Sequence, residues 1–377
     1  MSNLIGQGGF GCIYWPGITC KGNIEKTNKY VSKLQKKNLE SENEYKIGLI
    51  VKSINNYDKM FAPIIKRCNI SLHEIDDTFL SECDIIKRYQ KDSEFSLMKI
   101  KYVDSKTFFD VIYKSDNKKL LAICLESFPL LCESLKQLVS KRIVHLDLKE
   151  NNIIYNSKTN TPIILDFGLS INMNLLLNSD SKKWMDEIYH YFYVYAPDYI
   201  VWPFEVHYIN YLLYNNQNPT VSEIRELCKS VVNNMRFIKL YSPNFKEKYI
   251  EKAVNFYSKY IGTNYKNVIK ELLKHYETWD QYSLSIIYLN LLNRIFADKI
   301  VKNDLIIYFS QILIKNVSPD PKGRFSIETS MKLYNKIYNL GNVSVKSFRD
   351  LLTEINVDRK KTFIEIEKDS KRNTREK

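Results

Sequence analysis

The strongest chemical signal in the sequence is the segment Ile143-Val144-His145-Leu146-Asp147-Leu148-Lys149-Glu150-Asn151-Asn152-Ile153-Ile154, and Leu165-Asp166-Phe167-Gly168 follows it closely. These two segments place three oxygen-bearing side chains, those of Asp147, Asn152 and Asp166, in polar turns beside short β-type runs. Phosphoryl transfer needs a carboxylate that orients an acceptor hydroxyl, and oxygen ligands for Mg²⁺. Each segment alone is typical of a polar turn, but their order and spacing together predict a phosphoryl-transfer site.

Each polar residue in these segments has a role that its chemistry suggests. Asp147 supplies the orienting carboxylate, whereas Asn152 and Asp166 supply hard oxygen ligands for a metal ion. Lys149 can neutralise charge on the moving phosphoryl group. For His145 the pattern favours a structural hydrogen bond over a role as a base.

Four of the eleven glycines fall within the first dozen residues, at Gly6, Gly8, Gly9 and Gly11. With Ile13 they fit G-x-G-x-x-G followed by an aliphatic residue, a pattern in which backbone amides close over phosphates. An ordinary glycine hairpin is the alternative. A dinucleotide-binding fold would need a helix directly after the glycines, but residues 12–16 are typical of a strand and a turn.

Lys33 and Glu44 are the other candidates in the N-terminal part. Lys33 shares a strand face with Val31, so its ammonium can lie above a nucleotide, although a solvated lysine is the simpler interpretation. A lysine that grips phosphates needs a carboxylate partner, and Glu44 has apolar residues behind it at helical spacing. Glu40 and Glu42 compete for this role, and a solvated helix face is the alternative for each of them.

The elements predicted from residue patterns change in kind along the chain. Strand-like runs and turns extend to about residue 115, with the clearest runs at 30–34 and 94–98, and a helix over 38–54 interrupts them. A long helix begins at about residue 118, and two strand-like runs follow at 153–155 and 162–165. The remainder is helical up to a charged tail after about residue 356. We therefore expect an α+β fold, with a small β-rich part and a larger helical part.

Composition limits the class of protein. Among 377 residues, 44% are hydrophobic and 26% charged, which excludes a wholly disordered chain, and the net charge of +13 suits anionic partners. No window of 18 uninterrupted apolar residues occurs, so we expect no membrane span, and the first residues do not resemble a secretory leader.

Seven scattered cysteines without a C-x-x-C pair predict neither a disulfide framework nor a zinc site. They favour a reducing, cytoplasmic location.

Together these segments resemble the eukaryotic-type protein kinase family over roughly residues 4–338. The resemblance implies a two-lobed fold, with an N-lobe over 1–103, a C-lobe over 104–356 and a tail over 357–377. It implies ATP and Mg²⁺ (or Mn²⁺) as cofactors and a protein substrate as partner. The glycine-rich opening, the long insertions and the composition also resemble kinases of large cytoplasmic DNA viruses. That resemblance implies the host cytoplasm or the virion as location.

The resemblance also implies roles for individual residues. Gly6, Gly8 and Gly11 match the glycine-rich loop, and Lys33 and Glu44 match the phosphate-binding lysine and its helix partner. The catalytic loop is matched by His145-Leu146-Asp147 with Asn152, and the magnesium motif by Asp166-Phe167-Gly168. The adenine site would involve Ile100 as gatekeeper and Lys101, Tyr102 and Val103 as hinge. Asp280, in Trp279–Leu284, would brace the catalytic loop, and Arg324 would pair with the acid that closes the activation segment. That acid is either Asp198 or Glu205.

Three departures from the family pattern bear on function. Leu146 replaces the arginine that reads an activation-loop phosphate, so we expect activity without such phosphorylation. Five positions before Ala196, where the family usually has its hydroxyl residue, this chain has Tyr191. Lys149 still favours Ser/Thr acceptors by analogy with the family. Insertions occur near 72–92 and over 199–278. We expect the second to be a helical subdomain that docks a partner or braces the larger lobe.

The leading hypothesis is an ATP-dependent protein kinase that phosphorylates Ser/Thr hydroxyls. A pseudokinase-like nucleotide-binding scaffold is the main alternative, and a small-molecule phosphotransferase is a further one. The lysines are spread along the chain rather than gathered in an arginine–aromatic tract, so no specific nucleic-acid binding is expected.

Overall fold

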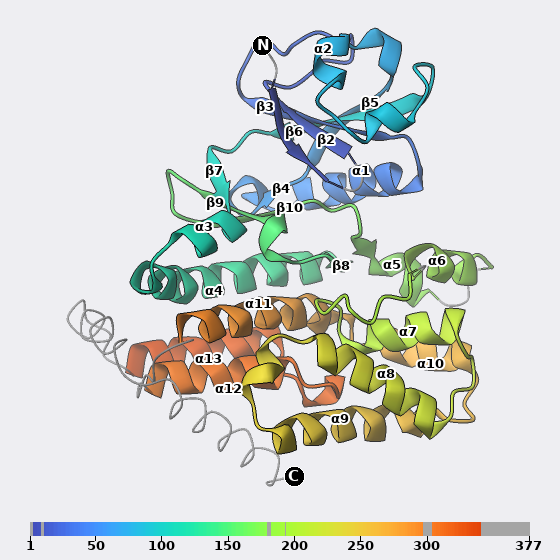
Figure 1. Cartoon of the computed structure of the whole chain (residues 1–377), viewed down its shortest axis with the longest axis vertical. Helices are drawn as coiled ribbons and strands as arrows, with labels where there is room; N and C mark the ends of the chain where they lie inside the picture. The colour runs from blue at the N-terminus through green and yellow to red at the C-terminus, as the bar shows by residue number, and fades with distance from the viewer. Residues whose placement is uncertain (1–2, 9–10, 179–181, 193, 297–303, 341–377) are drawn as a thin grey trace. The chain divides into compact units, whose positions relative to one another are not determined.

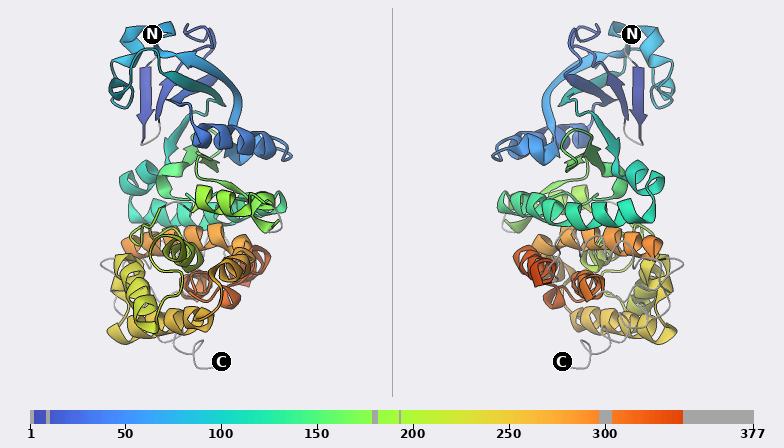
Figure 2. Two further views of the ribbon diagram at one scale, coloured as in Figure 1. Left: turned by 90° about the vertical axis from the view of Figure 1, so that its right-hand side faces the viewer. Right: turned by 90° about the vertical axis from the view of Figure 1, so that its left-hand side faces the viewer.

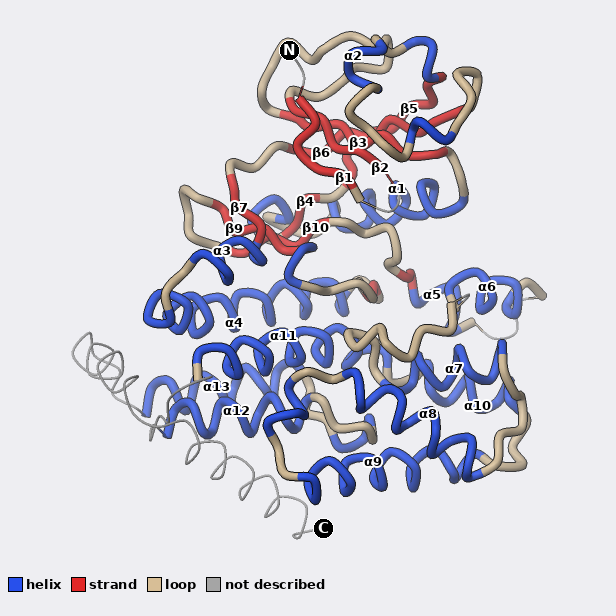
Figure 3. The backbone as a smooth tube through the Cα atoms, viewed as in Figure 1, coloured by secondary structure: helices blue, strands red, loops and turns tan. Residues whose placement is uncertain are grey.

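The computed structural model describes residues 3–8, 11–178, 182–192, 194–296 and 304–340 (Figure 1). Its chain forms two compact units, one of Met1–Phe108 with Asn151–Ile171 and one of Phe109–Glu150 with Asn172–Lys377. Strands are concentrated in the first unit and helices in the second (Figure 3). The predicted α+β class, with a small β-rich part and a larger helical part, is therefore confirmed. The charged tail over 357–377 lies outside the described residues.

A five-stranded antiparallel sheet with the order β1-β2-β3-β6-β5 forms the centre of the first unit. The strands are β1 (Asn3–Gln7), β2 (Gly11–Trp15), β3 (Tyr30–Lys36), β5 (Ile64–Ser71) and β6 (Glu94–Lys101). The strands predicted over 30–34 and 94–98 are two of these, and they pair with each other, Lys33 opposite Met98.

The helix predicted over 38–54 is α1 (Leu39–Lys52). It begins where the Asn38 side chain accepts a hydrogen bond from the Ser41 amide, while the Ser41 hydroxyl accepts one from the Asn38 amide. A β-carbon on Gly48 would lie 2.5 Å from the Ile64 carbonyl oxygen, so this glycine permits the close approach of α1 to β5. Glu44 is one of the buried residues of this helix.

The insertion near 72–92 is a cap of short elements, η2 (Leu72–Glu74), α2 (Asp77–Leu80) and η3 (Ile86–Arg88). Its apolar side chains join those of the sheet in one buried cluster, which adds apolar area to the core of this unit. The cluster comprises Cys12, Tyr14, Ile18, Leu34, Ile70, Leu72, Ile75, Leu80, Cys83, Ile86, Phe95 and Leu97.

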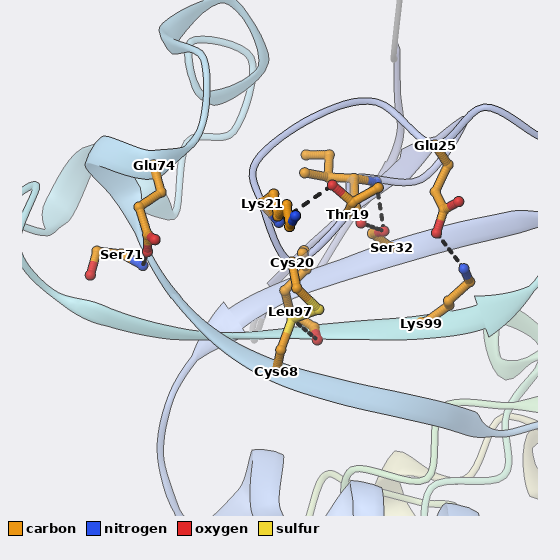
Figure 4. The surroundings of a disulfide bond; sticks show 11 residues. Thr19, Cys20, Lys21, Glu25, Ser32, Cys68, Ser71, Glu74, Leu97 and Lys99 are labelled. Atoms are coloured by element: carbon orange, nitrogen blue, oxygen red, sulfur yellow. Dashed lines mark hydrogen bonds and ion pairs between the residues drawn. A yellow bond between two sulfur atoms is a disulfide. The ribbon is translucent and has the colours of Figure 1, made fainter.

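Two disulfides link elements of the first unit, so the prediction that the cysteines form no disulfides is wrong. Cys12 of β2 pairs with Cys83 of the cap, and Cys20 pairs with Cys68 of β5 (Figure 4). These partners lie 71 and 48 residues apart in sequence, and the sheet and its cap bring them together. Local spacing carries no sign of such a pairing. Cys124, Cys132 and Cys228 are buried thiols.

A smaller sheet in the first unit carries the magnesium motif. Its order is β4-β10-β9-β7, from β4 (Phe61–Ala62), β7 (Ser105–Thr107), β9 (Ile153–Asn156) and β10 (Pro162–Leu165). The predicted runs at 153–155 and 162–165 are β9 and β10. Because β10 ends at Leu165, it delivers Asp166 directly after the strand.

The second unit is mainly helical, and Figure 2 shows it from two further sides. Its long helices include α4 (Asn117–Ser140), which is the helix predicted from residue 118, α11 (Trp279–Ile295), α12 (Asp304–Asn316) and α13 (Ile327–Leu340). Aromatic rings of Phe128, Tyr288, Phe309 and Tyr334 meet in the core between these helices. Among the described residues, no helix has both the length and the apolar character needed to span a bilayer.

The insertion over 199–278 is helical, as predicted. It contains α7 (Phe204–Tyr214), α8 (Val221–Asn234), α9 (Pro243–Tyr257) and α10 (Tyr265–Leu273). Shorter helices α5 (Met173–Leu177) and α6 (Trp184–Tyr191) precede it. Tyr249 of α9 donates a hydrogen bond to the Val317 carbonyl, and Tyr257 donates one to the Pro319 carbonyl, so α9 braces a part of this unit outside the insertion.

Candidate functional site

Three charged residues of the first unit form one cluster. The Lys33 ammonium lies 2.9 and 2.8 Å from the two carboxylate oxygens of Glu44 and 3.0 Å from Asp166 Oδ1. Lys33 and Glu44 are buried, and Asp166 is partly exposed. Burial alone would lower the pKa of Lys33, but the Glu44 and Asp166 carboxylates raise it above its ordinary value. The lysine is therefore a fixed positive charge, and Glu44, rather than Glu40 or Glu42, holds it.

The backbone around Asp166 is held in an unusual conformation. Asp166 has a φ of +64°, in the left-handed region that costs a non-glycine residue free energy. The Phe167 ring packs edge-on against Phe61, and the Asn43 side chain donates a 2.8 Å hydrogen bond from Nδ2 to the Ser170 carbonyl. These contacts on both sides stabilise the strained turn and aim the carboxylate at Lys33. Asn152, the other predicted metal ligand, is buried in the same unit.

The described glycines of the glycine-rich segment lie at the end of β1 and the start of β2, and the Gly8 amide donates to the Gly11 carbonyl at 3.0 Å. A β-carbon on Gly11 would lie 2.5 Å from the Leu34 carbonyl oxygen, so packing of β2 on β3 requires this glycine. At Gly6 a β-carbon would meet only Ile13, and at Gly8 it would meet no atom within 4 Å. The fold therefore does not require a glycine at position 8. Gly9 lies outside the described residues.

The predicted adenine-binding residues lie at the end of β6. Ile100 is half-buried and pairs with Val31 on one side and Ile64 on the other. Beyond the strand, the Tyr102 amide donates to the Lys29 carbonyl, and the Tyr102 ring stacks on Trp15 at 4.8 Å. The Val103 carbonyl accepts a hydrogen bond from Ser105 Oγ. Ile13 lies opposite Lys33 in the neighbouring strand.

In the second unit, Asp147 and Lys149 meet a residue that sequence reasoning missed, Tyr199. The Lys149 ammonium lies 2.9 Å from Asp147 Oδ1 and 3.1 Å from the Tyr199 hydroxyl, which donates a short hydrogen bond to Asp147. Asp147 is buried, whereas Lys149 and Tyr199 are half-buried. The sequence signal for Tyr199 is its position six residues before Glu205, but it is informative only once Glu205 is known to close the segment.

Asp280 of α11 braces the loop that carries Asp147. Its carboxylate accepts hydrogen bonds from the amides of His145 at 2.6 Å and Leu146 at 3.0 Å. Leu146 has a φ of +62°, and its carbonyl accepts a 2.9 Å hydrogen bond from Trp202 Nε1. These hydrogen bonds, to the amide and to the carbonyl of Leu146, offset the cost of its left-handed conformation. The brace expected of Asp280 is thus present in the structure, and the Leu146 side chain is buried.

The acid that pairs with Arg324 is Glu205, and Asp198 is exposed. The two guanidinium–carboxylate distances are 2.8 and 2.7 Å, and both side chains are fully buried. Trp279 Nε1 donates to Glu205, and Arg324 donates to the carbonyl of Ser318. A bidentate, fully hydrogen-bonded pair of this kind fixes the end of the segment that begins after Gly168.

The residues of the first unit fit a nucleotide with its metal. A fixed ammonium suits a phosphate, Asn152 and Asp166 are both oxygen donors of the kind that Mg²⁺ prefers, and Gly8 leaves backbone accessible beside the sheet. Within the described part of the chain, no group of three or more His, Cys, Asp or Glu side chains could hold a metal ion.

Comparisons with known proteins include similarities to protein kinases. The chain is 36% identical over 92 residues to a probable serine/threonine-protein kinase, mkcE, of Dictyostelium discoideum, a match that covers 24% of this chain and 12% of that protein. The kinase domain of Mycobacterium tuberculosis PknI is a structural neighbour with a TM-score of 0.41 and 11% sequence identity, over 89% of this chain and 93% of that domain. No protein-family model matches the chain.

Proposed function

We propose that this protein is an ATP- and Mg²⁺-dependent protein kinase that phosphorylates Ser/Thr hydroxyls of protein substrates. The observation that carries the proposal is the contact of Lys33 with both Glu44 and Asp166. A buried ammonium held by one carboxylate and touching a second, partly exposed one suits a phosphate–metal site better than it suits a purely structural role. The similarity to a probable Ser/Thr kinase supports the same class of reaction.

In the proposed reaction Lys33 binds and orients phosphate oxygens, and Asn152 and Asp166 hold the metal ion. The bound Mg²⁺ would supply charge neutralisation for the transferred group. The hydroxyl of the acceptor would donate its proton toward Asp147, and Lys149 beside it would bind the phosphoryl oxygens. Gly6, Gly8, Gly9, Gly11 and Ile13 would cover the phosphates, and Ile100, Tyr102 and Val103 would face adenine.

We further propose that activity does not depend on phosphorylation of the segment between Gly168 and Glu205. The buried Leu146 offers no cation that could bind such a phosphate. The segment is instead fixed by the Glu205–Arg324 pair and by the contact of Tyr199 with Asp147. Unmodified protein made in bacteria should therefore be active. Activity that appears only after phosphorylation of this segment would contradict the proposal.

The direct test is transfer of label from γ-labelled ATP to a generic basic and a generic acidic protein in the presence of Mg²⁺ or Mn²⁺. Wild-type protein should label at least one substrate or itself, and Asp166→Asn should abolish the labelling because the metal loses its charged ligand. Nucleotide binding without transfer under any of these conditions would favour the nucleotide-binding scaffold. Transfer to a small molecule but to no protein would favour the small-molecule phosphotransferase. A cytoplasmic location remains a proposal that the cysteines do not support, because four of the seven are paired in disulfides.

A further inference from the structure

The second unit contains a basic pocket of about 440 Å³ where the first residues of α6 and of α10 meet. Figure 1 labels both helices within this unit. Among the described residues, three lysines and two asparagines line it together with Trp184 and Met185, and none of these is acidic. The lysines are Lys182, Lys266 and Lys270, and the asparagines are Asn264 and Asn267.

The three lysines form no ion pair within the described part of the chain, whereas their neighbour Lys274 does. Lys274, at the end of α10, lies 2.8 Å from Glu271. Asp186 and Glu187 lie on α6 beyond Trp184 but are not part of the lining. Within the described residues, three cations therefore gather around one space whose lining holds no carboxylate, an arrangement that repels cations and attracts a ligand with more than one negative charge.

Trp184, one of the lining residues, is held by its burial and by a hydrogen bond. The Trp184 side chain is 4% exposed, and its Nε1 donates a 2.7 Å hydrogen bond to the Leu176 carbonyl. The Lys270 ammonium lies over the Trp184 ring, 5.4 Å from its centroid. A cation held by an aromatic face loses less conformational entropy on binding an anion than a lysine that extends into solvent.

Backbone dipoles add to the charge of the lysines. α6 begins at Trp184 and has no side-chain cap, and α10 begins at Tyr265 after the cap Asn264, which accepts from the Lys266 amide. The positive ends of both helices are thus at this pocket, and the first turn of a helix favours anions. The dipoles act in the same direction as the three lysines.

We propose that this pocket binds a phosphorylated side chain of the protein substrate, so that the kinase prefers substrates that already carry a phosphate. This inference rests on the proposed function. α6 lies in the segment between Asp166 and Glu205, and the same segment carries Tyr199, which contacts Asp147. A phosphate with nearly two negative charges and three acceptor oxygens fits three lysines and two asparagine amides better than a single carboxylate does.

The test compares casein with the same casein after enzymatic dephosphorylation, using the full chain. The wild type should show a KM about tenfold lower for the phosphorylated form. The double variant Lys266→Gln/Lys270→Gln should lose this difference. Lys274→Gln is the matched control, because it removes a lysine from the same region that is already paired with Glu271, and it should keep the wild-type ratio of the two KM values.

Binding without transfer separates this proposal from the proposed function. Fluorescence anisotropy should show that a labelled phosphoserine peptide binds at least tenfold more tightly than its serine and glutamate versions, and that Lys266→Gln/Lys270→Gln removes the difference. Such binding without any transfer would keep the pocket and overturn the kinase. Equal binding of the three peptides, or unchanged preference in the double variant, would overturn the pocket. Displacement of the labelled phosphoserine peptide by single-stranded RNA, but not by the same peptide without label, would also overturn the proposed pocket.

Discussion

The Lys33 ammonium lies 2.8 Å from Glu44 Oε2, and this buried pair also reaches Asp166 at 3.0 Å. A strand, a helix and a turn after a second strand supply the three residues, which are up to 133 positions apart in sequence. The two carboxylates differ in burial, since Glu44 is buried with the lysine whereas Asp166 is partly exposed. Stability and activity should therefore depend on these residues in different ways.

The first prediction separates the effect of Lys33 on stability from its effect on activity. Lys33→Met should lower the free energy of unfolding by about 3–5 kcal/mol, because Glu44 would remain buried without a partner. The double variant Lys33→Met/Glu44→Gln should recover most of that stability, yet stay inactive because no ammonium is left for the phosphate. Urea denaturation and transfer assays on both variants measure this. Recovery of activity in the double variant would show that Lys33 serves structure alone.

A second prediction concerns Tyr199, whose hydroxyl donates to Asp147 and accepts from Lys149. Tyr199→Phe removes both bonds and leaves the ring, so kcat should fall about tenfold while the KM for ATP stays the same. Tyr195→Phe, in an exposed tyrosine of the same segment, is the control and should behave as the wild type. A rise in kcat for Tyr199→Phe would instead mean that the tyrosine blocks the acceptor.

The third prediction tests which acid closes the segment. Arg324→Met should destabilise the protein by about 3–5 kcal/mol, because it leaves the Glu205 carboxylate buried and unpaired. Asp198→Asn should change the unfolding free energy by no more than about 0.5 kcal/mol, since Asp198 is exposed. Denaturant titrations of the two variants decide the matter. Equal destabilisation by both substitutions would contradict the assignment of Glu205.

The fourth prediction concerns the cysteines. Protein alkylated in denaturant without reductant should carry three labels, at Cys124, Cys132 and Cys228, and reduction should raise the number to seven. In a loop-closure model each disulfide adds about 4 kcal/mol of stability, as an upper estimate. Mass spectrometry gives the count. Seven labels without reductant, on protein isolated from its own compartment, would show that the disulfides do not form there.

Local patterns were sufficient for much of the fold and for most residues of the cluster. Strand alternation placed Lys33, helical spacing placed Glu44, and a polar turn after an apolar run placed Asp166, because each of these depends on a few neighbouring residues. The pairing of Cys12 with Cys83 depends on a cap that folds back over the sheet, and no local pattern contains it. The contact of Tyr199 with Asp147 depends on whether Glu205 or Asp198 meets Arg324, which only three-dimensional packing decides.

The central claim is that Asp147 orients an acceptor hydroxyl for phosphoryl transfer from ATP. The most direct measurement is the rate of label transfer from γ-labelled ATP to a protein substrate by wild type and by Asp147→Asn, with nucleotide affinity measured beside it. We predict a rate about 10²–10⁴-fold lower for the variant, with ATP bound as in the wild type. Equal rates in the two proteins, or no transfer by the wild type under any condition tested, would contradict the claim.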